Sequence, residues 1–267
     1  MARYIFEAAI EGATTLGRDT QRVTRWKQAL ALLPDYPTTK TQDPVVVDVE
    51  GAPPINYNIT VPATPVFPGD VVTWQDPAST RALFKRTIES IQWNGNNSMV
   101  MLGVARARLD MPDTLDWMRE EVLARLRPNG TLTLNRLGAR FNANGHYTEQ
   151  FAATMVLSEL LVQSVGDVIR VFPAWPKERD ARFHHLRTQG GFLVSAAMID
   201  GKIGRIEVKS TVGGPLRIVS PWKNVTVYHA DTASRQSLVL DAQNIGQLST
   251  QPGAHLIFEP QAKGTER

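Results

Sequence analysis

The 267-residue sequence contains no cysteine, which excludes a disulfide framework and a thiolate metal site. No stretch approaches the ~18 consecutive apolar residues of a transmembrane helix, and charges interrupt the first apolar residues, unlike in a signal peptide. The sequence has no Gly-rich phosphate loop, no Gly-x-Ser-x-Gly motif and no His-Glu-x-x-His motif. We therefore expect no cofactor, no metal and no membrane partner, while the compartment stays undecided.

The sequence also lacks a large excess of charge of either sign. The formal net charge is only +3, and the basic residues are scattered as singles and pairs. A nucleic-acid-binding protein typically gathers Lys and Arg into a patch or stripe, so we expect no nucleic-acid partner. An apolar fraction of 42% with 21% charged residues is ordinary for a globular protein, and the length allows one or two domains.

The N-terminal part of the chain has the periodicity of amphipathic helices. Apolar residues at helical spacing predict helices that begin near Tyr4, Asp19, Ser79, Ser98, Asp113 and Glu149. Residues 34–77 interrupt this pattern with nine of the 17 prolines of the chain. Because this segment also carries aromatic and apolar residues, we predict an ordered loop that packs on the helices.

Beyond Trp175 the periodicity changes to two, as in β-strands. Asp200-Gly201 predicts a type I′ turn between a strand from Phe192 and a return strand through Val208. Other strands are expected at residues 167–172, 216–219, 225–229, 237–240 and 255–258. The sequence thus predicts an α+β protein, with a helical domain over residues 1–165 and a small antiparallel β-sandwich over residues 166–267.

A polar loop before the helix near Glu149 is the first candidate site. Glu149 is expected in the first helical turn, where the helix dipole stabilises a carboxylate by ~0.3–1 kcal/mol. The preceding amides and rings can hydrogen-bond a polyol in a shared pocket. We therefore predict a carbohydrate substrate, with Glu149 as the catalytic candidate and these contacts: Asn142, Asn144, His146, Tyr147 and Thr148. The alternative is that Glu149 only stabilises its helix.

A second candidate site is the segment from Trp93 to Ser98. A tryptophan ring can stack on the C–H groups of a sugar, while neighbouring amides orient its hydroxyls. Trp93, Asn94, Asn96 and Asn97 are the candidate contacts. Asparagine-rich segments at helix starts are also common as caps and turns, so that interpretation stays open.

Two other pairs attract attention and are assigned no function. Glu120-Glu121 follows Arg119 within a predicted helix, and we interpret the pair as part of a solvated face. His184-His185 resembles a metal-ligand pair. Adjacent residues of a regular strand point to opposite faces, however, so we predict no metal ion there. We interpret residues 177–187, which contain the pair, as a solvated, partly interfacial linker.

Three segments together carry a resemblance to a known family. They are Leu160-Leu161-Val162-Gln163-Ser164, then Val168 to Pro176, then Leu186 to Val194, and the turn Asp200-Gly201 follows them. Over roughly residues 141–222 the chain resembles the C-terminal part of glycoside hydrolase family 95 and its uncharacterised relatives. The resemblance implies the last helices of an (α/α)6 barrel followed by a β-domain. It also implies inverting hydrolysis of α-linked fucosides or related sugars, by a glutamate general acid and an amide–carboxylate pair that activates water.

The chain departs from the family pattern at the start of the helix. Where the family has Asp-Gly-Asn-Phe-Gly, this chain has Thr148-Glu149-Gln150-Phe151-Ala152, so the nearest carboxylate is Glu149, one residue later. The resemblance therefore implies a water-activating role for Glu149 but no particular sugar.

The helix count implies an incomplete barrel. A full (α/α)6 barrel needs roughly twice the helices expected here, which would place the general acid upstream of Met1. We expect the C-terminal portion of a larger hydrolase, inactive alone, whose full-length relatives are often exported. The competing interpretations are a non-catalytic carbohydrate-binding module and a structural remnant without a ligand.

Overall fold

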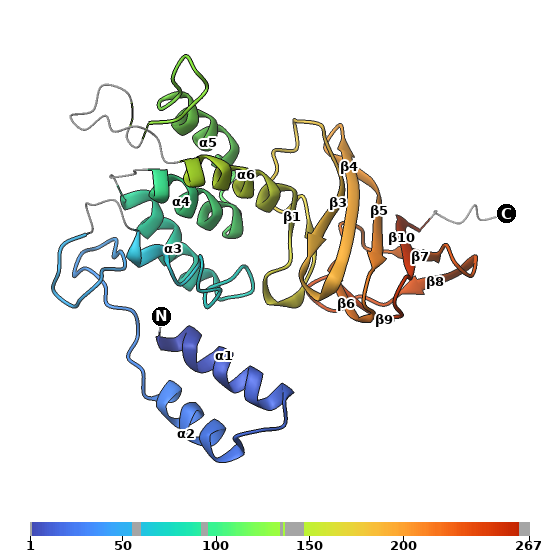
Figure 1. Cartoon of the computed structure of the whole chain (residues 1–267), viewed down its shortest axis with the longest axis horizontal. Helices are drawn as coiled ribbons and strands as arrows, with labels where there is room; N and C mark the ends of the chain where they lie inside the picture. Colours follow the sequence, from blue (N-terminus) through green and yellow to red (C-terminus); the bar gives the residue numbers. More distant parts are fainter. Residues whose placement is uncertain (1, 55–59, 92–95, 134–135, 137–146, 262–267) are drawn as a thin grey trace. The chain divides into compact units, whose positions relative to one another are not determined.

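The computed structural model describes residues 2–54, 60–91, 96–133, 136 and 147–261, without the side chains of residues 96–98 and 147–149. Within this part the protein is α+β, with six α-helices followed by antiparallel strands (Figure 1). The chain divides into two compact units. The first comprises Met1–Met111 and Met118–Ala153, and the second comprises Pro112–Trp117 and Thr154–Arg267.

The helices lie where hydrophobic periodicity predicts them. The structure places them at these bounds: α1 Ala2–Thr15, α2 Thr20–Ala31, α3 Ala78–Ser90, α4 Asn96–Arg108, α5 Thr114–Leu123 and α6 Tyr147–Leu161. Helices α1 and α2 form a hairpin without a buried residue, whereas α3 and α4 bury Phe84, Ile88, Met99 and Leu102. Apolar burial on α3 and α4 therefore supplies much of the core of the first unit.

The proline-rich segment is ordered over its described residues, as predicted. Val45, Val46 and Val47 are buried, and the Val46 N–H donates to Oγ1 of Thr87 in α3 at 2.9 Å. Val66, after a short 3-10 helix at Val61–Ala63, is fully buried. Prolines limit the backbone donors of this segment, but local backbone hydrogen bonds, such as that from the N–H of Val47 to the carbonyl of Pro37 at 2.9 Å, hold it together with packing.

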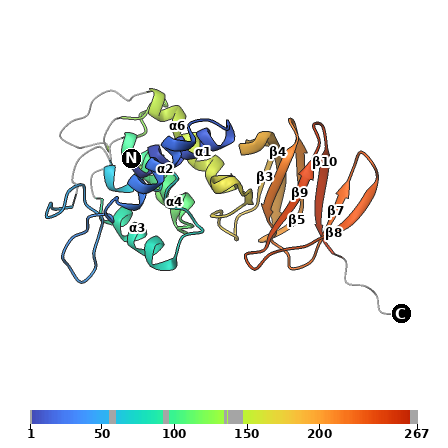
Figure 2. The same ribbon diagram turned by 90° about the horizontal axis from the view of Figure 1, so that it is seen from below.

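A six-stranded antiparallel sheet dominates the second unit, and both ribbon views show its strands side by side (Figures 1 and 2). Its order is β3-β4-β5-β10-β7-β8, and two-stranded pairs β1-β2 and β6-β9 accompany it. The strand bounds are β1 Val162–Gln163, β2 Arg170–Val171, β3 Ala181–Thr188, β4 Phe192–Ile199, β5 Lys202–Ser210, β6 Gly214–Val219, β7 Val225–His229, β8 Ser234–Leu238, β9 Ile245–Thr250 and β10 His255–Pro260.

One face of the six-stranded sheet belongs to a hydrophobic core. Phe183, Val194, Ile206 and Phe258 contribute from the sheet, and Leu216 contributes from β6. Residues on the opposite face of β3 and β5 are mostly half-buried or exposed. This alternation is what an antiparallel sheet with one covered face requires.

The predicted hairpin turn is confirmed by its backbone angles. Asp200 and Gly201 join β4 to β5 with φ values of 49° and 69°. Positive φ at both central positions is the requirement of a type I′ turn, which Asp-Gly meets with little strain. The strand expected at residues 237–240 begins earlier, at Ser234, and β9 had no prediction. The linker expected at residues 177–187 is wrong, because Ala181–Thr188 form strand β3, paired with β4.

The strand predicted at residues 167–172 is shorter than expected. A 3-10 turn covers Val165–Asp167, and only Arg170–Val171 form a strand. Asp167 and Phe172 have φ values of 57° and 52°, in the left-handed region. Because an extended strand requires negative φ, these two residues bound the short strand at both ends.

Candidate functional site

The structure places Glu149 in the first turn of α6, as predicted. The helix begins at Tyr147, so Tyr147, Thr148 and Glu149 are its first residues. Asn96 and Asn97 are the first two residues of α4, at the helix start where the sequence places them. The side chains of these five residues lie outside the described part of the chain, so their sugar contacts stay predictions.

The other candidate contacts lie wholly outside the described residues. They are Trp93, Asn94, Asn142, Asn144 and His146. Their predicted role in binding a carbohydrate therefore rests on residue chemistry alone. The part of the site with described geometry consists of the residues that contact the start of α6.

Gln150 follows Glu149 in the first turn of α6, and both the oxygen and the nitrogen of its side-chain amide form hydrogen bonds to the loop after α5. Its Oε1 accepts from the backbone N–H of Leu132 at 3.1 Å, and its Nε2 donates to the carbonyl of Gly130 at 3.1 Å. Leu132 is buried, so its N–H would otherwise lose a hydrogen bond to water. The amide thus fixes the first turn of α6, and with it the backbone of Glu149, to the loop that follows α5.

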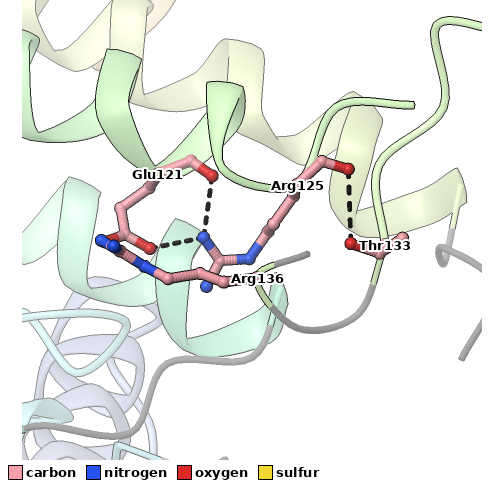
Figure 3. A network of polar contacts seen from close by, with 4 residues as sticks. All are labelled: Glu121, Arg125, Thr133 and Arg136. Atoms are coloured by element: carbon pink, nitrogen blue, oxygen red, sulfur yellow. Dashed lines mark hydrogen bonds and ion pairs between the residues drawn. The ribbon is translucent and has the colours of Figure 1, made fainter. Parts of the chain in front are cut away.

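A charged network between Glu121 of α5 and two arginines that follow the helix supports that loop (Figure 3). Glu121 is 1% exposed, and its two carboxylate oxygens form ion pairs with Arg125 and Arg136. Arg125 is fully buried and also donates to the carbonyl of Glu121 at 2.8 Å. The N–H of Thr133 in turn donates to the carbonyl of Arg125 at 2.9 Å. The network therefore joins α5 to residues 133 and 136, beyond the turn.

The interpretation of Glu120-Glu121 as a solvated face is wrong for Glu121. Glu120 is exposed, but Glu121 is buried among arginines. The spacing of Glu121 and Arg125, four residues apart on a helix, was the available signal for their pairing. Nothing in the sequence indicates that Arg136 forms the second ion pair with Glu121, because that contact depends on the turn between the two residues.

The arginines keep the buried carboxyl of Glu121 ionised. Burial raises the pKa of Glu121, but hydrogen bonds from Arg136 and Arg125, with their positive charges, outweigh burial and hold the pKa below its ordinary value. The hydrogen bond with Glu121 likewise raises the pKa of Arg136. Both shifts favour the charged pair, so this carboxylate has a structural role.

The lowered pKa of Glu121 predicts a specific loss of stability in acid. A group whose pKa is lower in the folded state stabilises the fold fully above its unfolded pKa, about 4.3 for Glu. That contribution is lost as the pH falls through the folded pKa. We therefore expect Glu121→Gln to lose less of its free energy of unfolding than the wild type between about pH 7 and about pH 3, as measured by urea denaturation. Parallel pH profiles would contradict this assignment.

Hydrogen bonds tie the C-terminal end of α6 to the residues that follow it. Nε2 of Gln163 donates to the carbonyl of Glu159 at 2.9 Å, and its Oε1 accepts from Nη1 of Arg170 at 3.3 Å. The N–H of Phe172 donates to the carbonyl of Leu161 at 2.7 Å. The Leu-Leu-x-Gln-Ser segment therefore serves as the junction at which α6 passes into the β1-β2 pair.

The histidine pair has a different geometry from the one expected. Phe183 pairs with Ala196, and Leu186 pairs with Val194, so His184 and His185 together oppose Ser195 in a β-bulge. Both histidines are exposed, between two residues that contact the core. The expectation that they point to opposite faces is wrong, since a bulge interrupts the alternation. Even so, no group of three or more His, Asp or Glu suited to a metal occurs among the described residues.

Comparison with known proteins identifies no family. No protein-family model matches the chain, and no curated protein matches its sequence. Within the described part of the chain, no helix has the length and apolar character needed to cross a bilayer. The family implied by the resemblance of residues 141–222 therefore stays a prediction.

Proposed function

We propose that the chain is the C-terminal portion of an inverting glycoside hydrolase that acts on α-linked, fucoside-like sugars. In this proposal Glu149 activates the attacking water. The observation that carries it is the placement of Glu149 in the first turn of α6, directly after the polar segment with the candidate sugar contacts. A helix N-terminus stabilises a carboxylate in its ionised form, which is the form a water-activating group requires.

The order of the elements supports the same proposal. Helices precede α6, the Gln163 junction follows it, and the chain continues into antiparallel strands. This is the order that the family resemblance implies, and we propose the helices as part of an (α/α)6 barrel and the strands as a β-sandwich. The proposal assigns residues 1–165 to the barrel portion and residues 166–267 to the sandwich.

An inverting site needs two carboxyl groups roughly 6.5–9.5 Å apart, one acid and one base. Glu121, the buried carboxylate of α5, is unsuited to be the acid because two arginines keep it ionised. A full barrel also requires roughly twice the helices found in the described part of the chain. We therefore propose that the general acid and the remaining helices lie in a segment on the N-terminal side.

The stereochemistry of the product tests this proposal. We expect the proposed full-length hydrolase, in which further helices precede Met1, to hydrolyse an aryl α-glycoside, and proton NMR to detect the β-anomer first. We expect the 267-residue chain alone to release no aryl group. Initial release of the α-anomer would contradict inversion, and turnover by the chain alone would contradict the missing acid. Sugar binding without turnover by the longer protein would favour the non-catalytic carbohydrate-binding module.

A further inference from the structure

A basic groove lies on the solvent-facing side of strands β3, β4 and β5. Its volume is about 560 Å³, and small residues of β4, Ser195 and Ala197, lie among its lining residues. Arg182 from β3 and Lys202 and Arg205 from β5 also line it. None of these residues belongs to the site around Glu149, and all lie in the second unit.

Two β-bulges border the groove, one on each neighbour of β4. On β3, His184-His185 oppose Ser195, whose Oγ accepts from the N–H of His185 at 3.0 Å. On β5, Ala196 pairs with Ile206 and Met198 pairs with Ile203, so Gly204 and Arg205 together oppose Ala197. Bulges increase the local twist of a sheet and redirect side chains, and here they bring cationic residues to one face.

The bulge on β5 decides the charge of this face. In a regular strand, Lys202 and Arg205 are an odd number of residues apart and would point to opposite faces. The extra residue places Ile203 and Ile206 on the core side and leaves both Lys202 and Arg205 exposed. Arg182, the partner of Ala197 on β3, is exposed beside them.

Cations outnumber anions in the groove. Glu207 is the one carboxylate among the lining residues, and its oxygens contact Nη2 of Arg205 at 2.7 Å and Nε2 of His255 at 3.4 Å. Among the described residues, Arg182 and Lys202 form no ion pair. Two cationic side chains therefore remain available to an anionic ligand, with Arg205 as a third that already shares a carboxylate.

The middle of the groove is open. A Cβ atom at Gly204 would meet no atom within 4 Å, and the φ of Gly204 lies outside the left-handed region. The lining contains no Phe, Tyr or Trp, the large rings on which neutral sugars and unpaired bases usually stack, and its one ring is the small imidazole of His184. Recognition in this groove therefore depends mainly on charge and hydrogen bonds.

We propose that this groove binds an acidic saccharide, through its sulfate or carboxylate groups, to Arg182, Lys202 and Arg205. The identification of the ligand as a saccharide rests on the proposed glycoside hydrolase function. Guanidinium groups bind planar carboxylates and sulfates with paired hydrogen bonds, and the serine and histidine at the β3 bulge add polar partners. The groove thus holds an anionic glycan on the β-sheet of the second unit.

A pair of variants at Gly204 tests the proposal. Gly204→Glu and Gly204→Gln add side chains of equal size to the open groove and differ only in charge. We expect Gly204→Glu to bind a heparin hexasaccharide or a galacturonate hexamer at least about tenfold more weakly than Gly204→Gln, by isothermal titration calorimetry at low salt. Lys223→Ala, which removes an exposed charge outside the groove, is the control and is expected to bind as the wild type does.

Varying the salt concentration and the ligand in the same experiment distinguishes binding of an acidic glycan from other kinds of binding. Binding is expected to weaken when salt rises from about 50 to about 300 mM, because the partners are exposed charges. Equal affinity of the Glu and Gln variants overturns the proposal, as does equal binding of an uncharged dextran oligomer. Tighter binding of duplex DNA than of the glycans overturns it in favour of a nucleic-acid partner.

Failure of this inference and failure of the proposed function give different results. Aryl-glycoside hydrolysis by the longer protein reports on Glu149, and the Gly204 variants are expected to leave that rate unchanged. Charge-dependent glycan binding without hydrolysis would support the groove and contradict the hydrolase. Hydrolysis by the full-length protein, with equal glycan binding by Gly204→Glu and Gly204→Gln, would support the hydrolase and contradict the groove. Unchanged melting temperatures of both variants ensure that the comparison concerns the folded protein.

Discussion

Replacing Glu121 with alanine is expected to lower the free energy of unfolding by about 3–5 kcal/mol. The substitution leaves the fully buried guanidinium of Arg125 without its carboxylate, and a buried charge without a partner is costly. Because a domain of ordinary stability unfolds with only ~5–15 kcal/mol, this loss would remove a large share of the total. Urea denaturation followed by circular dichroism measures it.

The chain offers a matched control and a rescue for this prediction. Glu120→Ala removes an exposed carboxylate from the same helix and is expected to change stability by no more than about 0.5 kcal/mol. Combining Glu121→Leu with Arg125→Met replaces the buried pair with apolar residues and is expected to recover most of the loss. If Glu121→Ala is as mild as Glu120→Ala, the network in Figure 3 does not stabilise the fold.

If the proposed full-length hydrolase exists, replacing Glu149 with glutamine is expected to lower its kcat by ~10²–10⁴-fold, the range typical of a lost general base. Glutamine keeps the size and hydrogen-bonding reach of the side chain but cannot accept the proton of the attacking water. KM is expected to change little, because the interaction lost is one made mainly in the transition state. Steady-state hydrolysis of an aryl α-glycoside measures both constants.

The same substitution separates catalysis from helix stabilisation. If Glu149 only stabilises α6, Glu149→Gln costs about 0.3–1 kcal/mol of stability and leaves kcat unchanged. Glu120→Gln, the same chemical change at an exposed position of α5, is the control and is expected to be neutral in both measurements. A wild-type kcat in Glu149→Gln would reject the proposed role.

Local sequence patterns were sufficient for the helices and for the hairpin. The start of α6 ahead of Glu149 and the positive φ at Asp200 and Gly201 follow from residues that are neighbours in the chain. Such features depend on helical periodicity and turn chemistry, which act over a few residues. The same local reasoning missed β3, because exposed Arg and His residues on its outer face and the bulge at His184-His185 obscure the alternation.

Contacts between distant residues decided the remaining features. The burial of Glu121 depends on Arg136, fifteen residues away, and the pairing of Val46 with Thr87 joins the proline-rich segment to α3. Neither partner is apparent from residue spacing, because each contact requires the chain to return on itself. Tertiary packing therefore buries Glu121 in an ion-pair network, whereas Glu120 is exposed as predicted.

By itself the sequence determined the helical first part, the antiparallel second part and the position of Glu149 at a helix start, because periodicity and turn residues express local backbone preferences. Only the tertiary structure decided that Lys202 and Arg205 share one face with Arg182. That arrangement depends on the strand register, since one extra residue on β5 changes which side chains face solvent. Register is a property of paired strands, so no single strand's sequence specifies it.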